Sequence, residues 1–143
     1  MNGKTQVSQW LDFAKDDLLA AHRLFEDYSP KQIFISCYHC QQAGEKALKA
    51  YLILKNVEFP FTHDLVKLCN LCMDMDMAFD DLLDACSDLT PYATQARYPN
   101  TSEITELITA AALRKAERIL SFVADLVPAA DEPLAQEGGP PCP

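Results

Sequence analysis

The stretch that decides the fold is residues 31–56, KQIFISCYHCQQAGEKALKAYLILKN. Apolar and small residues recur in it at alternating spacings of four and three, which is the period of an α-helix that buries one side. The residues of this apolar stripe are Ile33, Cys37, Cys40, Gly44, Ala47, Tyr51 and Leu54. The spacing therefore predicts a long helix from about Lys31 to Asn56.

The same periodicity predicts helices over most of the rest of the chain. They are expected at about residues 5–28, 63–75 and 77–94, with a last helix that follows a cap at Thr101 or Ser102 and ends near Val127. Pro30 ends the first helix because proline has no N–H. Thr62 is expected to cap the third helix, with Asp64 in its first turn. Long helices with short connections imply an all-α, up-and-down antiparallel bundle of about five helices.

One helical domain is expected over residues 1–127, because 143 residues suit a single core. Residues 128–143 hold five prolines and two glycines and are expected to be a disordered tail. No run approaches the roughly 20 apolar residues of a membrane span, and the N-terminus has no hydrophobic signal segment. The protein is therefore expected to be cytoplasmic, without membrane contact and with its six cysteines as thiols.

The net charge of −9 opposes general binding to DNA or RNA. Much of the negative charge falls in the predicted fourth helix and just before it, with no lysine or arginine in between. The acidic residues there are Asp74, Asp76, Asp80, Asp81, Asp84 and Asp88. They lack the glycine turn of a calcium loop. The run is interpreted as a solvated surface that would attract a basic protein.

A polar stripe lies opposite the apolar stripe of the second helix. His39, Gln42, Lys46 and Lys49 are spaced three, four and three apart, with Glu45 beside them. Residues at these spacings share one helix face. The two ammonium groups could bind phosphate while Gln42 and His39 contact polar edges. The alternatives are a solvated face with a Glu45–Lys49 pair, or a buried polar network at a dimer seam.

Two CxxC pairs, Cys37/Cys40 and Cys69/Cys72, raise the question of zinc. Four thiolates can complete a tetrahedral site. Both pairs, however, fall within predicted amphipathic helices, where thiols pack as small apolar groups. No glycine next to them supports the tight turns of a zinc knuckle. Neither a metal nor a cofactor is expected.

Three segments in order resemble the HEPN domain family. Residues 38–50, YHCQQAGEKALKA, resemble the signature of the family's second helix. Residues 62–65, THDL, resemble the turn into its third helix, and residues 97–99, RYP, resemble the loop before its last helix. Together the resemblance covers about residues 5–127.

The resemblance implies an up-and-down helical bundle of the nucleotidyltransferase substrate-binding-subunit type, usually a homodimer. It also implies a small nucleotidyltransferase as partner in a toxin–antitoxin-like module. Trp10 and the Asp17-Leu18 pair suit the family's first helix. The candidate nucleotide-binding residues are His39, Gln42, Lys46, Lys49 and Arg97, and the secondary candidates are Glu45, His63, Asp64 and Tyr98.

Two of these candidates have open alternatives. Arg97 could bind an anion with its planar fork or cap the carbonyls that end the fourth helix. His63 and Asp64 could be an acid/base pair or the start of a helix cap.

Ribonuclease members of the family carry an arginine followed by a histidine after four to six residues. After Arg97 those positions hold Ser102, Glu103 and Ile104, so this signature is absent. The sequence therefore predicts a non-catalytic nucleotide-binding or protein-interaction module. The alternative is a diverged ribonuclease that uses His39 or His63 across a dimer seam.

Overall fold

The structure, a computed structural model, describes residues 5–94 and 104–128. The sequence predictions for Arg97, Tyr98 and the tail lie outside these residues. Helices occupy most of the described chain, and no strand occurs in it. The elements are α1 (Gln6–Glu26), α2 (Ile33–Leu54), α3 (Leu65–Met75), the 3₁₀ helix η1 (Met77–Leu82), α4 (Leu83–Leu89), the 3₁₀ helix η2 (Thr90–Ala93) and α5 (Glu106–Leu126).

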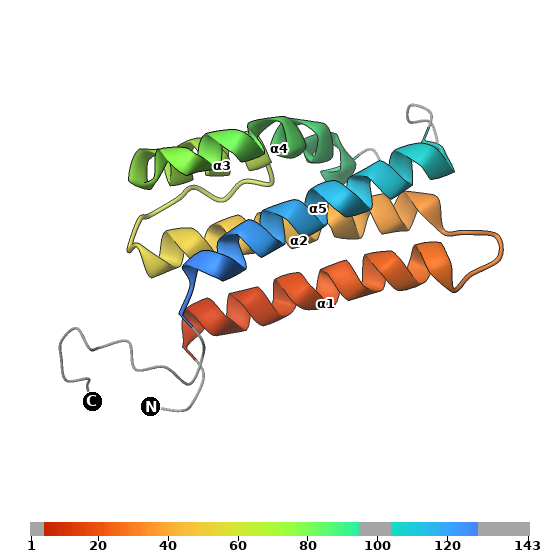
Figure 1. The fold of residues 1–143 in the computed structure, drawn as a ribbon, viewed down its shortest axis with the longest axis horizontal. Coiled ribbons are helices and arrows are strands. Elements are labelled where there is room, and N and C mark those ends of the chain that lie inside the picture. Colours follow the sequence, from red (N-terminus) through yellow and green to blue (C-terminus); the bar gives the residue numbers. More distant parts are fainter. Residues whose placement is uncertain (1–4, 95–103, 129–143) are drawn as a thin grey trace.

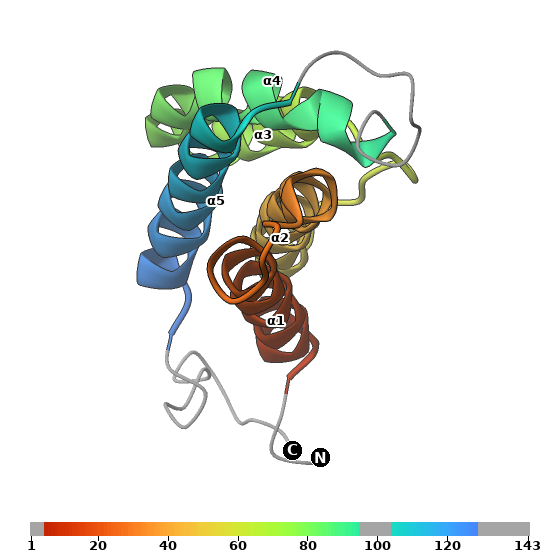
Figure 2. The same cartoon turned by 90° about the vertical axis from the view of Figure 1, so that its right-hand side faces the viewer.

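The helices form an up-and-down bundle, which confirms the predicted fold class. The chain reverses direction from α1 to α2, from α2 to the α3–α4 layer, and again into α5 (Figure 1). Seen from the end, α2 has α1, α5 and the α3–α4 layer on three sides (Figure 2). No described helix covers its fourth side, which we call the open face of α2. In the described ranges, no helix has the length and apolar character needed to cross a bilayer.

Two helix starts differ from the sequence prediction. The N-cap of α3 is Asp64, whose carboxylate accepts from Val66 N and Lys67 N, whereas Thr62 accepts only from Asp64 N. Thr62 lies two residues before the N-cap position, too early to accept from the first helical turn. The N-cap of α5 is Thr105, which accepts from Ile108 N at 3.1 Å, rather than Thr101 or Ser102. Each cap is the residue next to the first helical turn, as capping geometry requires.

The predicted fourth helix is not one regular α-helix. Between Met77 and Ala93 the backbone forms a 3₁₀ helix, two turns of α-helix and a second 3₁₀ helix. Asp76 ends α3 and accepts from Ala78 N at 3.0 Å, which starts the first 3₁₀ turn. Pro91 has no N–H to continue the α-helical ladder, so the last turn tightens.

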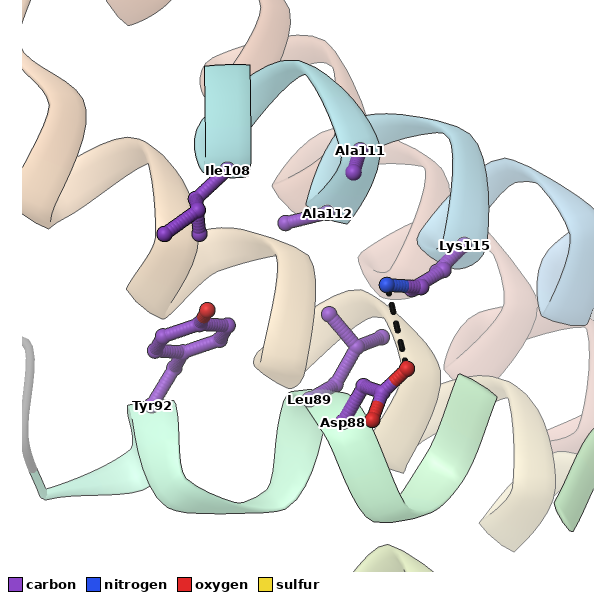
Figure 3. Close-up of a pocket in the computed structure, with 7 residues that line it drawn as sticks. All are labelled: Asp88, Leu89, Tyr92, Ile108, Ala111, Ala112 and Lys115. Atoms are coloured by element: carbon purple, nitrogen blue, oxygen red, sulfur yellow. Dashed lines mark ion pairs between the residues drawn. The ribbon is translucent and has the colours of Figure 1, made fainter. Parts of the chain in front are cut away.

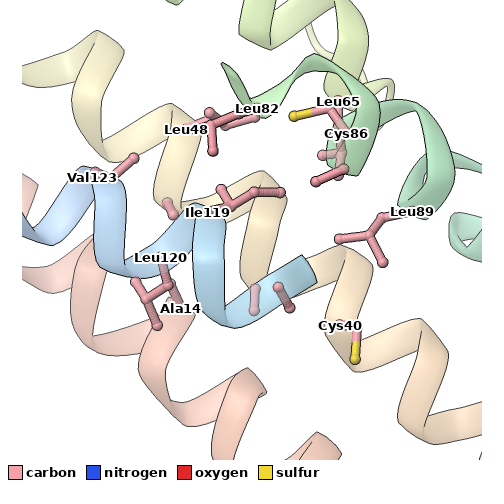
Figure 4. Close-up of a cluster of buried hydrophobic side chains, with 14 of the residues drawn as sticks. Ala14, Cys40, Leu48, Leu65, Leu82, Cys86, Leu89, Ile119, Leu120 and Val123 are labelled. Carbon is pink, nitrogen blue, oxygen red and sulfur yellow. The ribbon is translucent and has the colours of Figure 1, made fainter. Parts of the chain in front are cut away.

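The core lies where α2 meets α3, α4 and α5. Side chains from these elements converge around Ile119 (Figure 4). A methyl group added at Gly44 would lie 3.2 Å from Leu65 Cδ1 and 3.4 Å from Ile119 Cδ1. The glycine therefore allows α2 to approach α3 and α5 closely. This side of α2 is the predicted apolar stripe, so the periodicity predicted the correct buried face.

Candidate functional site

The polar residues of α2 are held by two carboxylates, Asp17 on α1 and Glu45 on α2 itself. Asp17, on α1, accepts from His39 Nδ1 at 2.8 Å and from Lys46 Nζ at 2.6 Å. Burial raises the pKa of Asp17, but the hydrogen bonds and charges of His39 and Lys46 outweigh burial, so the net pKa is lowered. Asp17 is therefore ionised at neutral pH and ties α1 to α2.

Glu45, on α2, is the centre of a second group of hydrogen-bonded side chains. Its carboxylate accepts from Lys49 Nζ at 2.8 Å, His63 Nδ1 at 3.0 Å and Gln41 Nε2 at 3.1 Å. Burial raises the pKa of Glu45, but these three hydrogen bonds lower it further than burial raises it. We call Gln41, Glu45, Lys49 and His63 the Glu45 network.

Lys49 corrects the expectation of an accessible basic stripe. The predicted Glu45–Lys49 ion pair exists, but Lys49 is only 5% exposed. Its Nζ lies 5.7–5.9 Å from the ring centroids of Trp10, Phe59 and Phe61. A helical spacing fixes the direction of a side chain but not what covers it, and here α1 and the loop after α2 supply aromatic rings. Lys49 is thus a buried structural cation.

His63 pairs with Glu45 and not with Asp64. Asp64 caps α3, while Gln41 Nε2 also donates to the His63 carbonyl at 2.9 Å. Of the two alternatives for His63 and Asp64, the acid/base pair is therefore wrong, and the capping alternative holds for Asp64. The loop before α3 is bound to α2 through both the backbone and the ring of His63.

Both imidazoles are oriented in the same way. A carboxylate can only accept a hydrogen bond, so Nδ1 of His39 and Nδ1 of His63 each carry a proton. In the neutral ring, Nε2 is then an unprotonated acceptor, and in the imidazolium it becomes a donor. This carboxylate–imidazole arrangement also fixes the ring, as it does in many ligand-binding histidines.

The accessible polar groups of the open face are fewer than the sequence suggested. His39 and Lys46 are each 27% exposed at the side chain, and Gln42 is half-buried and donates to Gln41 Oε1 at 2.7 Å. One exposed ring lies beside them: Phe13 on α1, whose centroid is 6.0 Å from Lys46 Nζ. Phe61, in the loop after α2, is also exposed and lies beside Lys49 and His63. The structure thus brings together four of the five candidate nucleotide-binding residues and buries one of them; the fifth, Arg97, is outside the described residues.

The role of Asp17 and Gln41 did not follow from the sequence. Asp17 looks like one of several acidic residues on the exposed part of α1, and only the packing of α1 against α2 gives it His39 and Lys46 as partners. Gln41 lies next to the polar stripe, but one of its hydrogen bonds goes to the backbone of His63, more than 20 residues away. The one signal in the sequence for the role of Asp17 would have been a match between the polar positions of the predicted first and second helices.

The four cysteines of the two CxxC pairs are packed in the interior of the bundle, as predicted from their place in amphipathic helices. Cys37, Cys40, Cys69 and Cys72 are all buried, on α2 and α3. Burial raises the pKa of the Cys40 and Cys72 thiols well above the usual range, which disfavours thiolate. Within residues 5–94 and 104–128, no group of three or more His, Cys, Asp or Glu side chains is arranged to hold a metal ion.

A small cavity of about 80 Å³ lies between α5 and the α4–η2 segment (Figure 3). Leu89 and Ala112 line its apolar part, and an ion pair of 3.0 Å joins Asp88 and Lys115 at its edge. Arg118 also donates to the backbone oxygen of Asp81 at 2.6 Å. The acidic residues between Asp74 and Asp88 are therefore partly neutralised by basic side chains of α5. This proximity of α5 could not be predicted from the order of the residues in the sequence.

Comparison with known proteins fits this helical architecture. The sequence model of the HEPN domain matches residues 7–126. The chain belongs to the HEPN domain family. This confirms the resemblance found in the QQAGEK, THDL and RYP segments.

Two solved structures share the fold of this HEPN domain over 85% of the chain and 98% of their own length. TT1696 from Thermus thermophilus is 27% identical with a TM-score of 0.73. ST0689, an archaeal HEPN homologue, is 25% identical with a TM-score of 0.68. Among curated proteins, none matches the chain.

Proposed function

We propose that this HEPN domain is a non-catalytic nucleotide-binding module whose ligand lies on the open face of α2. The observation that carries the proposal is the arrangement of His39, Gln42 and Lys46. Along residues 40–52 of α2, Gln42 and Lys46 are the only residues that are not buried, and His39 just before this stretch is also partly exposed. Asp17 accepts hydrogen bonds from His39 and Lys46 and so fixes two of the three. A phosphate could accept charge-assisted hydrogen bonds from Lys46 and from His39 in its imidazolium form.

Charge sets the expected strength of this site. Asp17 neutralises much of the charge of Lys46, and Glu45 neutralises Lys49, so the open face carries little net positive charge. The net charge of −9 adds a general repulsion of anions. The affinity is therefore modest and falls with salt. Lys49 contributes to the site through its buried ion pair with Glu45. We retain Arg97 as a further contributor to nucleotide binding.

Changing Lys46 and Asp17 should move nucleotide affinity in opposite directions. Lys46→Ala removes the accessible cation and should weaken ATP binding about three- to tenfold, since a charged hydrogen bond is lost. Asp17→Asn removes the negative charge that competes for Lys46, while the amide oxygen can still accept from His39 Nδ1, so binding should become stronger. Isothermal titration calorimetry at low salt measures both changes.

Lys15→Ala is the matched control, because Lys15 is exposed on α1 and its loss changes the net charge equally. It should change ATP affinity by less than twofold. The proposal fails if the wild type does not bind ATP at millimolar concentration, or if Lys15→Ala and Lys46→Ala weaken binding to the same extent.

We further propose that the domain is a homodimer. Large apolar side chains are exposed on α1 and α2, including Phe13, Leu19 and Ile35, and a second copy could cover them. Sedimentation at micromolar concentration should give a mass of twice the 16.0 kDa chain. A single 16.0 kDa species under these conditions would exclude the dimer.

Family membership also supports a small nucleotidyltransferase as protein partner, in a toxin–antitoxin-like module that works in the cytoplasm. A neighbouring gene for such an enzyme, and co-elution of the two proteins after co-expression, would support this partner. Failure of the two purified proteins to co-elute would count against it.

The second candidate function is RNA cleavage at a dimer seam. The observation that favours it is the pairing of both His39 and His63 with a carboxylate through Nδ1, since such rings can exchange protons through Nε2. The missing arginine–histidine signature argues against it. Cleavage of a short RNA by the wild type, lost in His39→Ala or His63→Ala, would select this function over simple binding.

A further inference from the structure

The loop between α2 and α3 is hydrogen-bonded to the bundle at His63 and at Leu65, the first residue of α3. Gln41 and Glu45 bind the carbonyl and the ring of His63. Thr62 Oγ1 accepts from Asp64 N at 3.0 Å, and Thr90 Oγ1 accepts from Leu65 N at 3.1 Å. The backbone at His63 and Leu65, two and four residues after Phe61, is therefore held in place by hydrogen bonds to α2 and η2.

Phe61 projects from this fixed loop and is 89% exposed. Its ring contacts His63 edge-to-face, with centroids 5.5 Å apart and planes at 69°. Lys49 Nζ lies 5.9 Å from the same ring centroid. These contacts orient the ring but leave most of its surface in water, so a flat ligand can stack on it without displacing protein groups.

His63 adds a directional polar contact next to the ring. Its Nδ1 is occupied by Glu45, and its side chain is 49% exposed. The Nε2 atom of the neutral ring can accept a hydrogen bond from an amino or imino group of a ligand. An exposed aromatic face beside an oriented acceptor is the combination that proteins use for unpaired nucleobases.

The position of Phe61 suits a ligand whose phosphate lies on the open face of α2. Lys49, whose Nζ lies 5.9 Å from the Phe61 ring centroid, is three residues beyond Lys46 on α2, a rise of about 4.5 Å along the helix axis. The rise from Lys46 to Lys49 and the step from Lys49 Nζ to the Phe61 ring are together comparable with the length of a nucleotide. A base on Phe61 and a phosphate beside Lys46 and His39 would thus belong to a single ligand.

We infer that Phe61 and His63 form a nucleobase subsite, which takes the base of a nucleotide by stacking on Phe61 and a hydrogen bond to His63. This inference rests on the proposed nucleotide-binding function and extends it to the recognition of the base. Neither residue was assigned to base contact by the spacing of the α2 stripe.

Comparison of AMP with ribose 5-phosphate, which lacks the base, tests the subsite. Calorimetry should show that the wild type binds AMP more tightly than ribose 5-phosphate. Phe61→Ala should weaken AMP binding about fivefold or more, because base–aromatic stacking is lost. It should leave ribose 5-phosphate within twofold of the wild type, and Phe61→Tyr should retain the affinity for AMP.

Tyr28→Ala is the control, since Tyr28 is also an exposed aromatic residue but lies beyond the end of α1. It should bind AMP as the wild type does. The subsite is excluded if the wild type binds AMP and ribose 5-phosphate equally, or if Phe61→Ala leaves AMP affinity unchanged. If neither ligand binds the wild type at millimolar concentration, the proposed function itself fails.

Discussion

Replacing Glu45 with alanine is expected to lower the free energy of unfolding by about 3–5 kcal/mol, the usual cost of removing one partner of a buried ion pair. Lys49 would remain 5% exposed among aromatic rings with no carboxylate to bind. Gln41 and His63 would each lose a hydrogen bond as well. Urea unfolding followed by circular dichroism measures the change.

Two comparisons separate the ion pair from a general effect of substitution. Glu58→Ala, at an exposed position in the loop after α2, should change stability by less than about 0.5 kcal/mol. The double variant Glu45→Leu, Lys49→Met should recover part of the loss, because it removes both buried charges. A loss below about 1 kcal/mol for Glu45→Ala would mean that Lys49 finds water in the folded state.

Acid provides an independent check of the same carboxylate. The pKa of Glu45 is lowered in the folded protein, so its contribution to stability is present above the pKa of the unfolded chain and is lost as the pH falls through the folded value. The stability difference between the wild type and Glu45→Ala should therefore shrink below about pH 4. A difference that stays constant down to about pH 3 would assign the loss to packing instead.

The apolar stripe of α2 could be predicted because its repeating spacing lies within a single helix. Cys37, Gly44 and Tyr51 face the core as their spacing indicates. The polar stripe was harder, because the fate of a charged side chain depends on what another segment places beside it. Lys46 stays partly exposed and Lys49 is buried, although both belong to the same stripe.

The caps and 3₁₀ turns were missed for a different reason. Several adjacent residues could cap α3, and Thr62 and Asp64 both have a suitable side chain. The choice between them depends on the loop, which Gln41 and Glu45 bind from α2. The same tertiary contacts that moved the cap to Asp64 also paired His63 with Glu45, so an error in the local structure became an error in the candidate site.

Replacing Phe79 with alanine is expected to cost about 3–5 kcal/mol of stability, as deletion of a fully buried phenylalanine usually does. Phe79 lies on η1 with no exposed surface, and its ring centroid is 4.6 Å from that of Tyr51 and 4.8 Å from that of Phe122. The cavity would open between η1, α2 and α5. Thermal unfolding should show a correspondingly lower melting temperature.

The same variant should leave nucleotide affinity unchanged, measured where circular dichroism shows it folded. Phe79 contacts the apolar stripe of α2 at Tyr51, whereas His39 and Lys46 lie on the polar stripe. Phe61→Ala should do the reverse, since its ring is exposed: stability within about 0.5 kcal/mol of the wild type and weaker AMP binding. If Phe79→Ala also weakened AMP binding in the folded state, the binding face of α2 would depend on the packing of its core face, and the two sides of the helix could not be treated as independent.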